Sequence, residues 1–214
     1  MQAIERVLHI FSIILSLISA VFFIVGCAGY AAKKSTIEHA PWIIIEDGGY
    51  DMYFGLYKVF YSSGGTDGSV QYSHNCNSDW CNTCDKNGKG AVGLVFLALL
   101  FSIIVIAHTV YLLYTPSVGK QIANVFLSFA AACTSLIAVG LFMGDCYYAI
   151  KESNANTFPT KEMEWGPGAS VTILGMFFMW IVSFMQISLS AMEKGPEPSA
   201  AQQSTAMVGA VKSA

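Results

Sequence analysis

The chain has 214 residues, of which 54% are hydrophobic and 12% charged, and its formal net charge is −3. Soluble proteins carry about 25% charged residues, so the composition argues against a soluble domain, and the negative charge gives no argument for binding nucleic acid. Uncharged apolar stretches occupy 7–32, 91–114, 122–144 and 169–192. Each is long enough to cross a bilayer core, which needs about 20 helical residues.

These stretches predict an all-α membrane protein: a four-transmembrane-helix bundle with a small antiparallel β-sheet in the long first extramembrane loop. A single membrane domain covers 1–192, the long loop covers 33–90, and 193–214 form a flexible tail rich in Ala, Ser, Gln, Gly and Pro. We expect the first span to be a retained signal anchor, because it is longer than the apolar region of a signal peptide. The lipid bilayer is therefore the first predicted partner.

The long loop has strand-like segments separated by turn signals. Pro41–Ile45 is a β-branched run, Asp51–Tyr61 is rich in aromatic residues, and Ser69–His74 alternates between apolar and polar residues. We expect strands at these segments, with a hairpin around Gly64–Gly68. A sheet this small is marginal alone, so it should rest on the helix ends or on a partner.

Three cysteines, Cys76, Cys81 and Cys84, follow the last expected strand. Clustered loop cysteines are typical of a disulfide in an oxidising compartment, and we predict a Cys76–Cys84 bond with Cys81 as the alternative partner. With His74 these cysteines also form a candidate zinc site, but a single Cys-x-x-Cys with crowded partners is the weak form of that signal. The lysines do not decide the orientation. The cysteines favour loop 33–90 outside and both termini in the cytosol, in the plasma membrane rather than an organelle inner membrane.

Two histidines, His9 and His108, lie within the expected spans. An ionisable group inside a membrane is a functional candidate. The favoured interpretation is a neutral imidazole that hydrogen-bonds to a neighbouring helix, and a haem-binding pair is a weaker alternative. The sequence carries no nucleophile, phosphate-loop or zinc-protease motif. We therefore predict neither enzymatic activity nor a cofactor or small-molecule substrate.

The layout resembles the claudin, peripheral myelin protein and amastin class of tetraspan proteins. That class has a Trp early in a long first loop, then Gly-Leu-Trp followed by two cysteines. Here Trp42 is followed by Gly55-Leu56-Tyr57, with Tyr in place of the second Trp and a later cysteine cluster. The Gly-rich segment 165–169 resembles the entry to the fourth span of amastins. MARVEL-type tetraspans, with an entry like Arg6-Val7-Leu8, are a second resemblance, and tetraspanins fit less well because their large loop is the second one.

The resemblance implies a non-enzymatic protein that acts by contact, as a structural, adhesion or junction-like protein or an auxiliary subunit. Its partners are other membrane proteins or copies of itself. The predicted interaction surface consists of aromatic residues of the long loop: Trp42, Tyr53, Phe54, Tyr57, Phe60 and Tyr61. One alternative is an accessory subunit of a large respiratory or photosynthetic complex. A weaker one is a redox or haem-binding protein that uses His9, His108 and the cysteine cluster.

Overall fold

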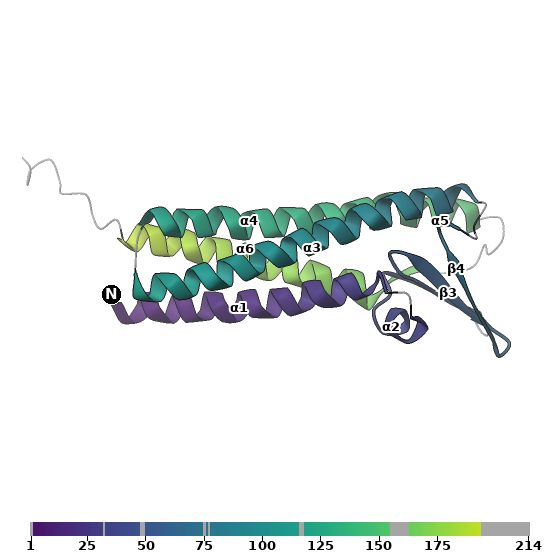
Figure 1. The fold of residues 1–214 in the computed structure, drawn as a ribbon, viewed down its shortest axis with the longest axis horizontal. Coiled ribbons are helices and arrows are strands. Elements are labelled where there is room, and N and C mark those ends of the chain that lie inside the picture. Colours follow the sequence, from purple (N-terminus) through teal and green to yellow (C-terminus); the bar gives the residue numbers. More distant parts are fainter. Residues whose placement is uncertain are drawn as a thin grey trace, which may run out of the picture.

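A bundle of long helices carries a β-sheet at one end (Figure 1). The computed structural model describes residues 2–31, 33–47, 50–74, 76, 78–115, 118–154 and 163–193. Helix α1 (Gln2–Ala28) begins at the end of the bundle far from the sheet, and α6 (Pro167–Glu193) ends there. We call that end the terminus end and the other the sheet end.

Two further helical segments complete the bundle. Helix α3 covers Asp79–Tyr114, and α4 (Val118–Leu141) continues through a π-helical turn, η1 (Phe142–Cys146), into α5 (Tyr147–Asn154). All four long segments are apolar and long enough to cross a membrane, as predicted. The two middle ones extend beyond the predicted apolar stretches at the sheet end. The 36 residues of α3 cover about 54 Å, whereas a bilayer core is about 30 Å thick.

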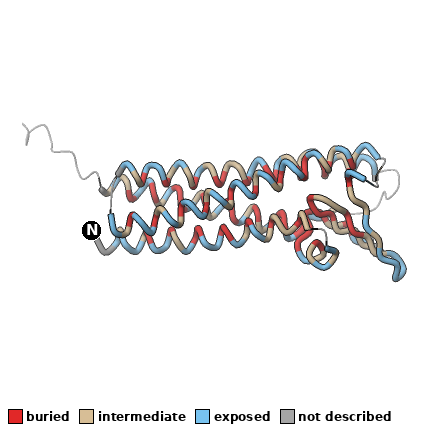
Figure 2. Tube along the Cα trace, viewed as in Figure 1, coloured by how far each residue is buried: buried red, intermediate tan, exposed pale blue. Residues whose placement is uncertain are grey.

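Small side chains face the inside of the bundle and large apolar side chains face its outside. On α3 the buried positions recur every three or four residues and include Ala91, Val95 and Ala98. Large apolar side chains point outward instead, and Phe96 and Ile103 are 54% and 50% exposed. In Figure 2 the buried residues follow the inward side of each helix. Small inward residues let the helix backbones approach closely, which is the usual packing in membrane bundles.

A five-stranded antiparallel sheet stands at the sheet end, with strand order β4-β3-β2-β1-β5. The strands cover Ile43–Asp47 (β1), Tyr50–Phe54 (β2), Lys58–Ser63 (β3), Thr66–Gln71 (β4) and Met163–Trp165 (β5). The predicted antiparallel sheet in the long loop is confirmed. So is the predicted hairpin, because Gly64 and Gly65 join β3 to β4 with φ angles of +56° and +83°.

The strand division differs from the prediction at three places. The last strand of the long loop covers Thr66–Gln71 rather than Ser69–His74. The aromatic run Asp51–Tyr61 is two strands rather than one, because the chain turns at Gly55 and Leu56 between β2 and β3. The short β5 comes from the loop before α6 and pairs with β1, so the sheet joins two loops that are far apart in sequence. Neither the turn nor β5 gives a strong local signal, since both depend on contacts with the helices and with β1.

The turn between β2 and β3 is held between two helices. The amide of Leu56 donates to the carbonyl of Gly29, 2.6 Å away, just beyond α1. The buried hydroxyl of Tyr72 donates to the carbonyl of Gly55 at 2.8 Å. A side chain at Gly88 of α3 would overlap the Leu56 carbonyl oxygen. The first loop is therefore fixed to α1 and α3 through backbone atoms.

We expect Gly88→Ala to lower the free energy of unfolding by about 1–3 kcal/mol, because the added methyl group forces the Leu56 turn away from α3. The matched control is Gly93→Ala on the same helix, where an added Cβ meets no atom within 4 Å. The control should be neutral or stabilising by up to about 1 kcal/mol. Unfolding in detergent followed by circular dichroism checks both, and equal effects of the two substitutions would contradict this account of the turn.

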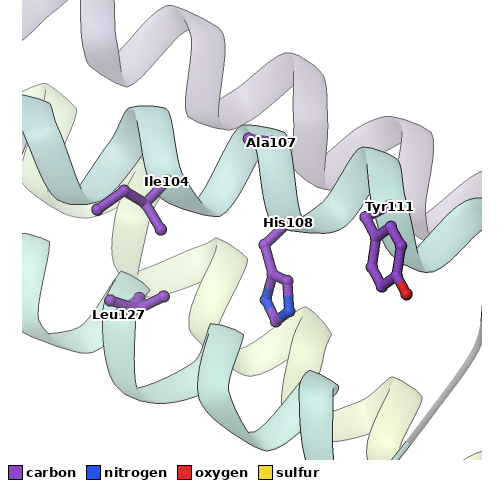
Figure 3. A pocket seen from close by; sticks show the side chains of 5 residues that line it. All are labelled: Ile104, Ala107, His108, Tyr111 and Leu127. Atoms are coloured by element: carbon purple, nitrogen blue, oxygen red, sulfur yellow. The ribbon is translucent and has the colours of Figure 1, made fainter.

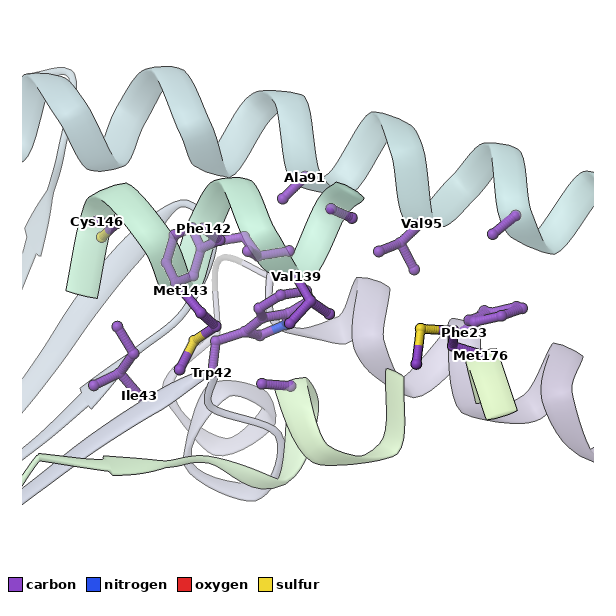
Figure 4. Close-up of a cluster of buried hydrophobic side chains, with 14 of the residues drawn as sticks. Phe23, Trp42, Ile43, Ala91, Val95, Val139, Phe142, Met143, Cys146 and Met176 are labelled. Atoms are coloured by element: carbon purple, nitrogen blue, oxygen red, sulfur yellow. The ribbon is translucent and has the colours of Figure 1, made fainter. Parts of the chain in front are cut away.

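Trp42 occupies the junction between the sheet and the bundle. Its side chain is fully buried, and its indole Nε1 donates to the carbonyl of Gly26 on α1 at 3.0 Å. The ring of Phe142 in η1 packs edge-on against it, with centroids 5.5 Å apart. Figure 4 shows Trp42 among side chains of η1, α4 and β1. Added side chains at Gly29 or Gly168 would collide with the indole, so the close approach of α1 and α6 to this ring requires glycine there.

The cysteine pairing differs from the predicted Cys76–Cys84 bond. The structure pairs Cys76 with Cys81, the alternative partner, and Cys84 with Cys146. The reason is that α3 begins at Asp79, well before the apolar stretch. Its first turns therefore carry both Cys81 and Cys84, and Cys84 lies beside η1 while Cys81 lies beside the chain entering the helix. Of the residues described, no group of three or more offers a metal site.

Candidate interaction surface of the sheet

One face of the sheet is covered by the bundle. The strand register puts Ile43, Phe54 and Val59 on the same face, and all three are buried. Phe54 packs against Trp80 of α3 with ring centroids 6.1 Å apart. The hydroxyl of Tyr147 in α5 donates to the Met163 carbonyl of β5 at 3.3 Å. The part of this face formed by Ile43, Phe54 and Val59 therefore belongs to the core.

The opposite face is partly covered by a short helix, α2 (Lys34–His39). The helix lies against β2 and β3 and buries its own Ile37 completely. Lys34 at its start forms ion pairs with Glu38 and with Asp67 of β4. The hydrogen bond from Lys34 holds the pKa of Asp67 below its usual value, and the same bond raises the pKa of Lys34.

Three of the six predicted interaction residues prove to be core residues. Trp42, Phe54 and Phe60 are 0%, 0% and 7% exposed. Trp42 fills the junction, Phe54 lies on the covered face, and Phe60 lies on the face that α2 covers. The prediction that these three contact a partner is wrong, because aromatic strand residues do not reveal in sequence which face another element covers.

The other three predicted residues, Tyr53, Tyr57 and Tyr61, are half-buried. The Tyr57 ring packs on Tyr30 with centroids 5.1 Å apart, beside the junction. The Tyr61 ring covers Gly68 on the neighbouring strand, where a side chain would overlap it. Only Tyr53 lies on the same face as α2 and on a central strand, so it is the predicted residue best placed to meet a partner.

A group of carboxylates lies near Tyr53 on this face, and no pattern in the sequence predicts it. Glu46 of β1 and Asp51 of β2 are directly opposite each other, and Glu164 of β5 is opposite Ile44 on the same face. Glu46 and Glu164 are exposed and Asp51 is half-buried. We call Glu46, Asp51, Tyr53 and Glu164 the acidic face.

The electrostatics of the acidic face are unfavourable in the isolated chain. Burial raises the pKa of Tyr53, and the charges of Asp51 and Glu46 raise it further. Like charges directly opposite each other on neighbouring strands destabilise a sheet. Lys34 reaches Asp67 and Glu38, and in the part of the chain that the structure describes no lysine pairs with Glu46, Asp51 or Glu164. The alternation in β1 and β2 is visible in the sequence, but their register is not.

The predicted hydrogen bond between His108 and a neighbouring helix is confirmed. Its Nδ1 lies 2.8 Å from Oδ1 of Asn124 on α4, and the Asn124 amide donates to Thr109 Oγ1 at 2.9 Å. The imidazole therefore links α3 to α4. His9 is 5% exposed on the inward side of α1. Its Nδ1 has no hydrogen-bond partner among the described residues.

Comparison with known proteins assigns the chain to no family. No protein-family model matches the sequence, and no curated protein matches it either. The bundle, its junction with the sheet and the acidic face are therefore the features that bear on function.

Proposed function

We propose that the four long helical segments cross a membrane, with the sheet on the non-cytosolic side of the plasma membrane and both termini in the cytosol. The support is the outward surface of the bundle. Large apolar side chains cover it along its length, as at Phe126, which is 70% exposed. Monomeric soluble proteins rarely expose contiguous apolar surface of this extent, whereas lipid accommodates it.

Exposed aromatic residues at both ends of the bundle support the same proposal. Trp165 and Tyr148 are 54% and 62% exposed near the sheet end, and Tyr111 and Tyr114 are 48% and 81% exposed at the terminus end. Tyr and Trp are enriched where a membrane protein meets the two interfaces. The disulfides at the sheet end favour an oxidising compartment there and hence a cytosolic terminus end.

We propose that the protein works by protein–protein contact through the acidic face, and that it belongs to the claudin-like class of tetraspan proteins. The observation that carries the contact proposal is the acidic face itself, on a sheet fixed to the bundle by Trp42 and the Leu56 turn. A preorganised surface loses little conformational entropy on binding. The early Trp42 and the antiparallel sheet of the first loop support the class.

The chemistry of the acidic face favours a cationic partner surface. Glu46 and Asp51 repel each other across β1 and β2, and a Lys or Arg from a partner would relieve that repulsion. Tyr53 beside them offers a ring of the kind enriched at interfaces. The partner is another membrane protein or a second copy of this chain, because the bundle holds the sheet close to the membrane.

Charge reversal tests this proposal. We expect the wild-type protein, extracted in mild detergent at low ionic strength, to migrate as a larger assembly that dissociates as salt is raised. The double variant E46K/D51K should lose that assembly. The control E152K reverses one carboxylate at an exposed site on α5 and should keep it. Retention of the assembly by E46K/D51K would refute the acidic face as the contact, and mass spectrometry of the assembly distinguishes self-association from an accessory role in a large complex.

A further inference from the structure

A groove runs along the outward side of α3 and α4 in the half of the bundle near the terminus end. Its volume is about 420 Å³, within the usual range of ligand sites of about 300–1,000 Å³. It is lined by Ile104, Ala107, His108, Tyr111 and Leu127. Figure 3 shows Ile104, His108 and Tyr111 projecting from α3, with Leu127 of α4 opposite them.

The groove is apolar in the part nearer the middle of the bundle and polar at the terminus end. Ile104, Ala107 and Leu127 supply only hydrocarbon to the part nearer the middle of the bundle. At the other end Lys120 donates from Nζ to the hydroxyl of Tyr111 at 3.1 Å. The same Nζ lies 4.3 Å from the centroid of the Tyr111 ring. The groove therefore has an apolar body and a cationic end.

The polar side chains of the groove are held in place. His108 is fixed by its bond to Asn124 on α4, so the imidazole remains between the two helices. Tyr111 is fixed by Lys120, which comes from the first turn of α4. Among the described residues Lys120 forms no ion pair, so its positive charge is not neutralised within that part of the chain.

We propose that this groove binds an anionic glycerophospholipid of the leaflet at the terminus end. One acyl chain lies along Ile104, Ala107 and Leu127, and the phosphate meets Lys120 and the hydroxyl of Tyr111. The proposal rests on the proposed membrane insertion, because a groove on the outward side of the bundle then faces lipid. A single lysine near an anionic membrane surface contributes about 1 kcal/mol, so the headgroup preference depends mainly on Lys120.

Native mass spectrometry of the full-length protein released from lipid nanodiscs tests this proposal. The probes are phosphatidylglycerol and phosphatidylcholine with identical acyl chains. We expect the protein to retain phosphatidylglycerol preferentially, and K120Q to weaken that retention about fivefold, which is 1 kcal/mol at 25 °C. The control K151Q removes a lysine at the sheet end and should leave retention unchanged. L127W, which fills the apolar part, should reduce retention of both lipids.

The outcomes separate this inference from the proposed function. Equal retention of the two lipids, or K120Q behaving like K151Q, would overturn the lipid site while leaving membrane insertion intact. Failure of the wild-type protein to enter nanodiscs would overturn both proposals. A stable dimer that protects the groove and excludes both lipids would likewise overturn the lipid site.

Discussion

Replacing Trp42 with alanine is expected to lower the free energy of unfolding by about 3–5 kcal/mol, because a large and fully buried aromatic side chain is lost. The indole fills the junction between η1, α1 and α6, and its hydrogen bond to the Gly26 carbonyl is lost as well. Detergent unfolding monitored by near-ultraviolet circular dichroism measures the change. The loss should also increase proteolysis of the first loop, since the sheet then loses one of its attachments to the bundle and keeps the Leu56 turn and the contact of Phe54 with Trp80.

The matched control is Trp165→Ala. Trp165 has the same side chain but is 54% exposed at the end of β5, just before α6. Its removal in detergent should therefore change the free energy of unfolding by no more than about 0.5 kcal/mol. Similar stability for the two variants would mean that Trp42 does not hold the sheet to the bundle.

The second large effect is expected from the Cys84–Cys146 disulfide. The bond closes a loop with a sequence separation of 62, and the chain-entropy model gives about 4 kcal/mol for its removal by C84S/C146S. That figure is an upper limit, because helical structure remaining in the detergent-unfolded state shortens the effective loop. Chemical unfolding in detergent measures it, and α3 should separate from η1 at lower denaturant concentration.

The Cys76–Cys81 bond provides the comparison within the same protein. Its sequence separation is only 5, so C76S/C81S should cost about 2 kcal/mol in the same model. The order of the two effects is the prediction. A larger loss from C76S/C81S than from C84S/C146S would show that the link from α3 to η1 does not set the stability of the sheet end.

The bundle was predictable because its signal is local and long. In lipid an uncharged apolar stretch such as 169–192 can satisfy its backbone hydrogen bonds by forming a helix, and the structure has a helix there. The extension of α3 back to Asp79 was not predictable in the same way. Residues 79–90 are polar and gain their helical order from tertiary contacts, such as the disulfide at Cys84 and the hydrogen bond from Asn87 to Asp145.

The surface of the sheet was predicted less well, for a related reason. Aromatic and β-branched content located the β-structure of the first loop, but burial depends on which elements cover which face. Helix α2 covers Phe60, and the bundle covers Phe54. The acidic face appears only once the register pairs Glu46 with Asp51 and adds Glu164 from a distant loop. A contact surface that combines residues of three strands cannot be recognised from the sequence of any one strand.

Site-specific photo-cross-linking in native membranes tests most directly whether the acidic face contacts another protein. A photoreactive amino acid replaces Glu46 in one variant and Glu152 of α5 in the other, both exposed positions. We expect a discrete cross-linked protein species at position 46 and none at position 152. Equal cross-linking at the two positions, or none at position 46, would contradict it.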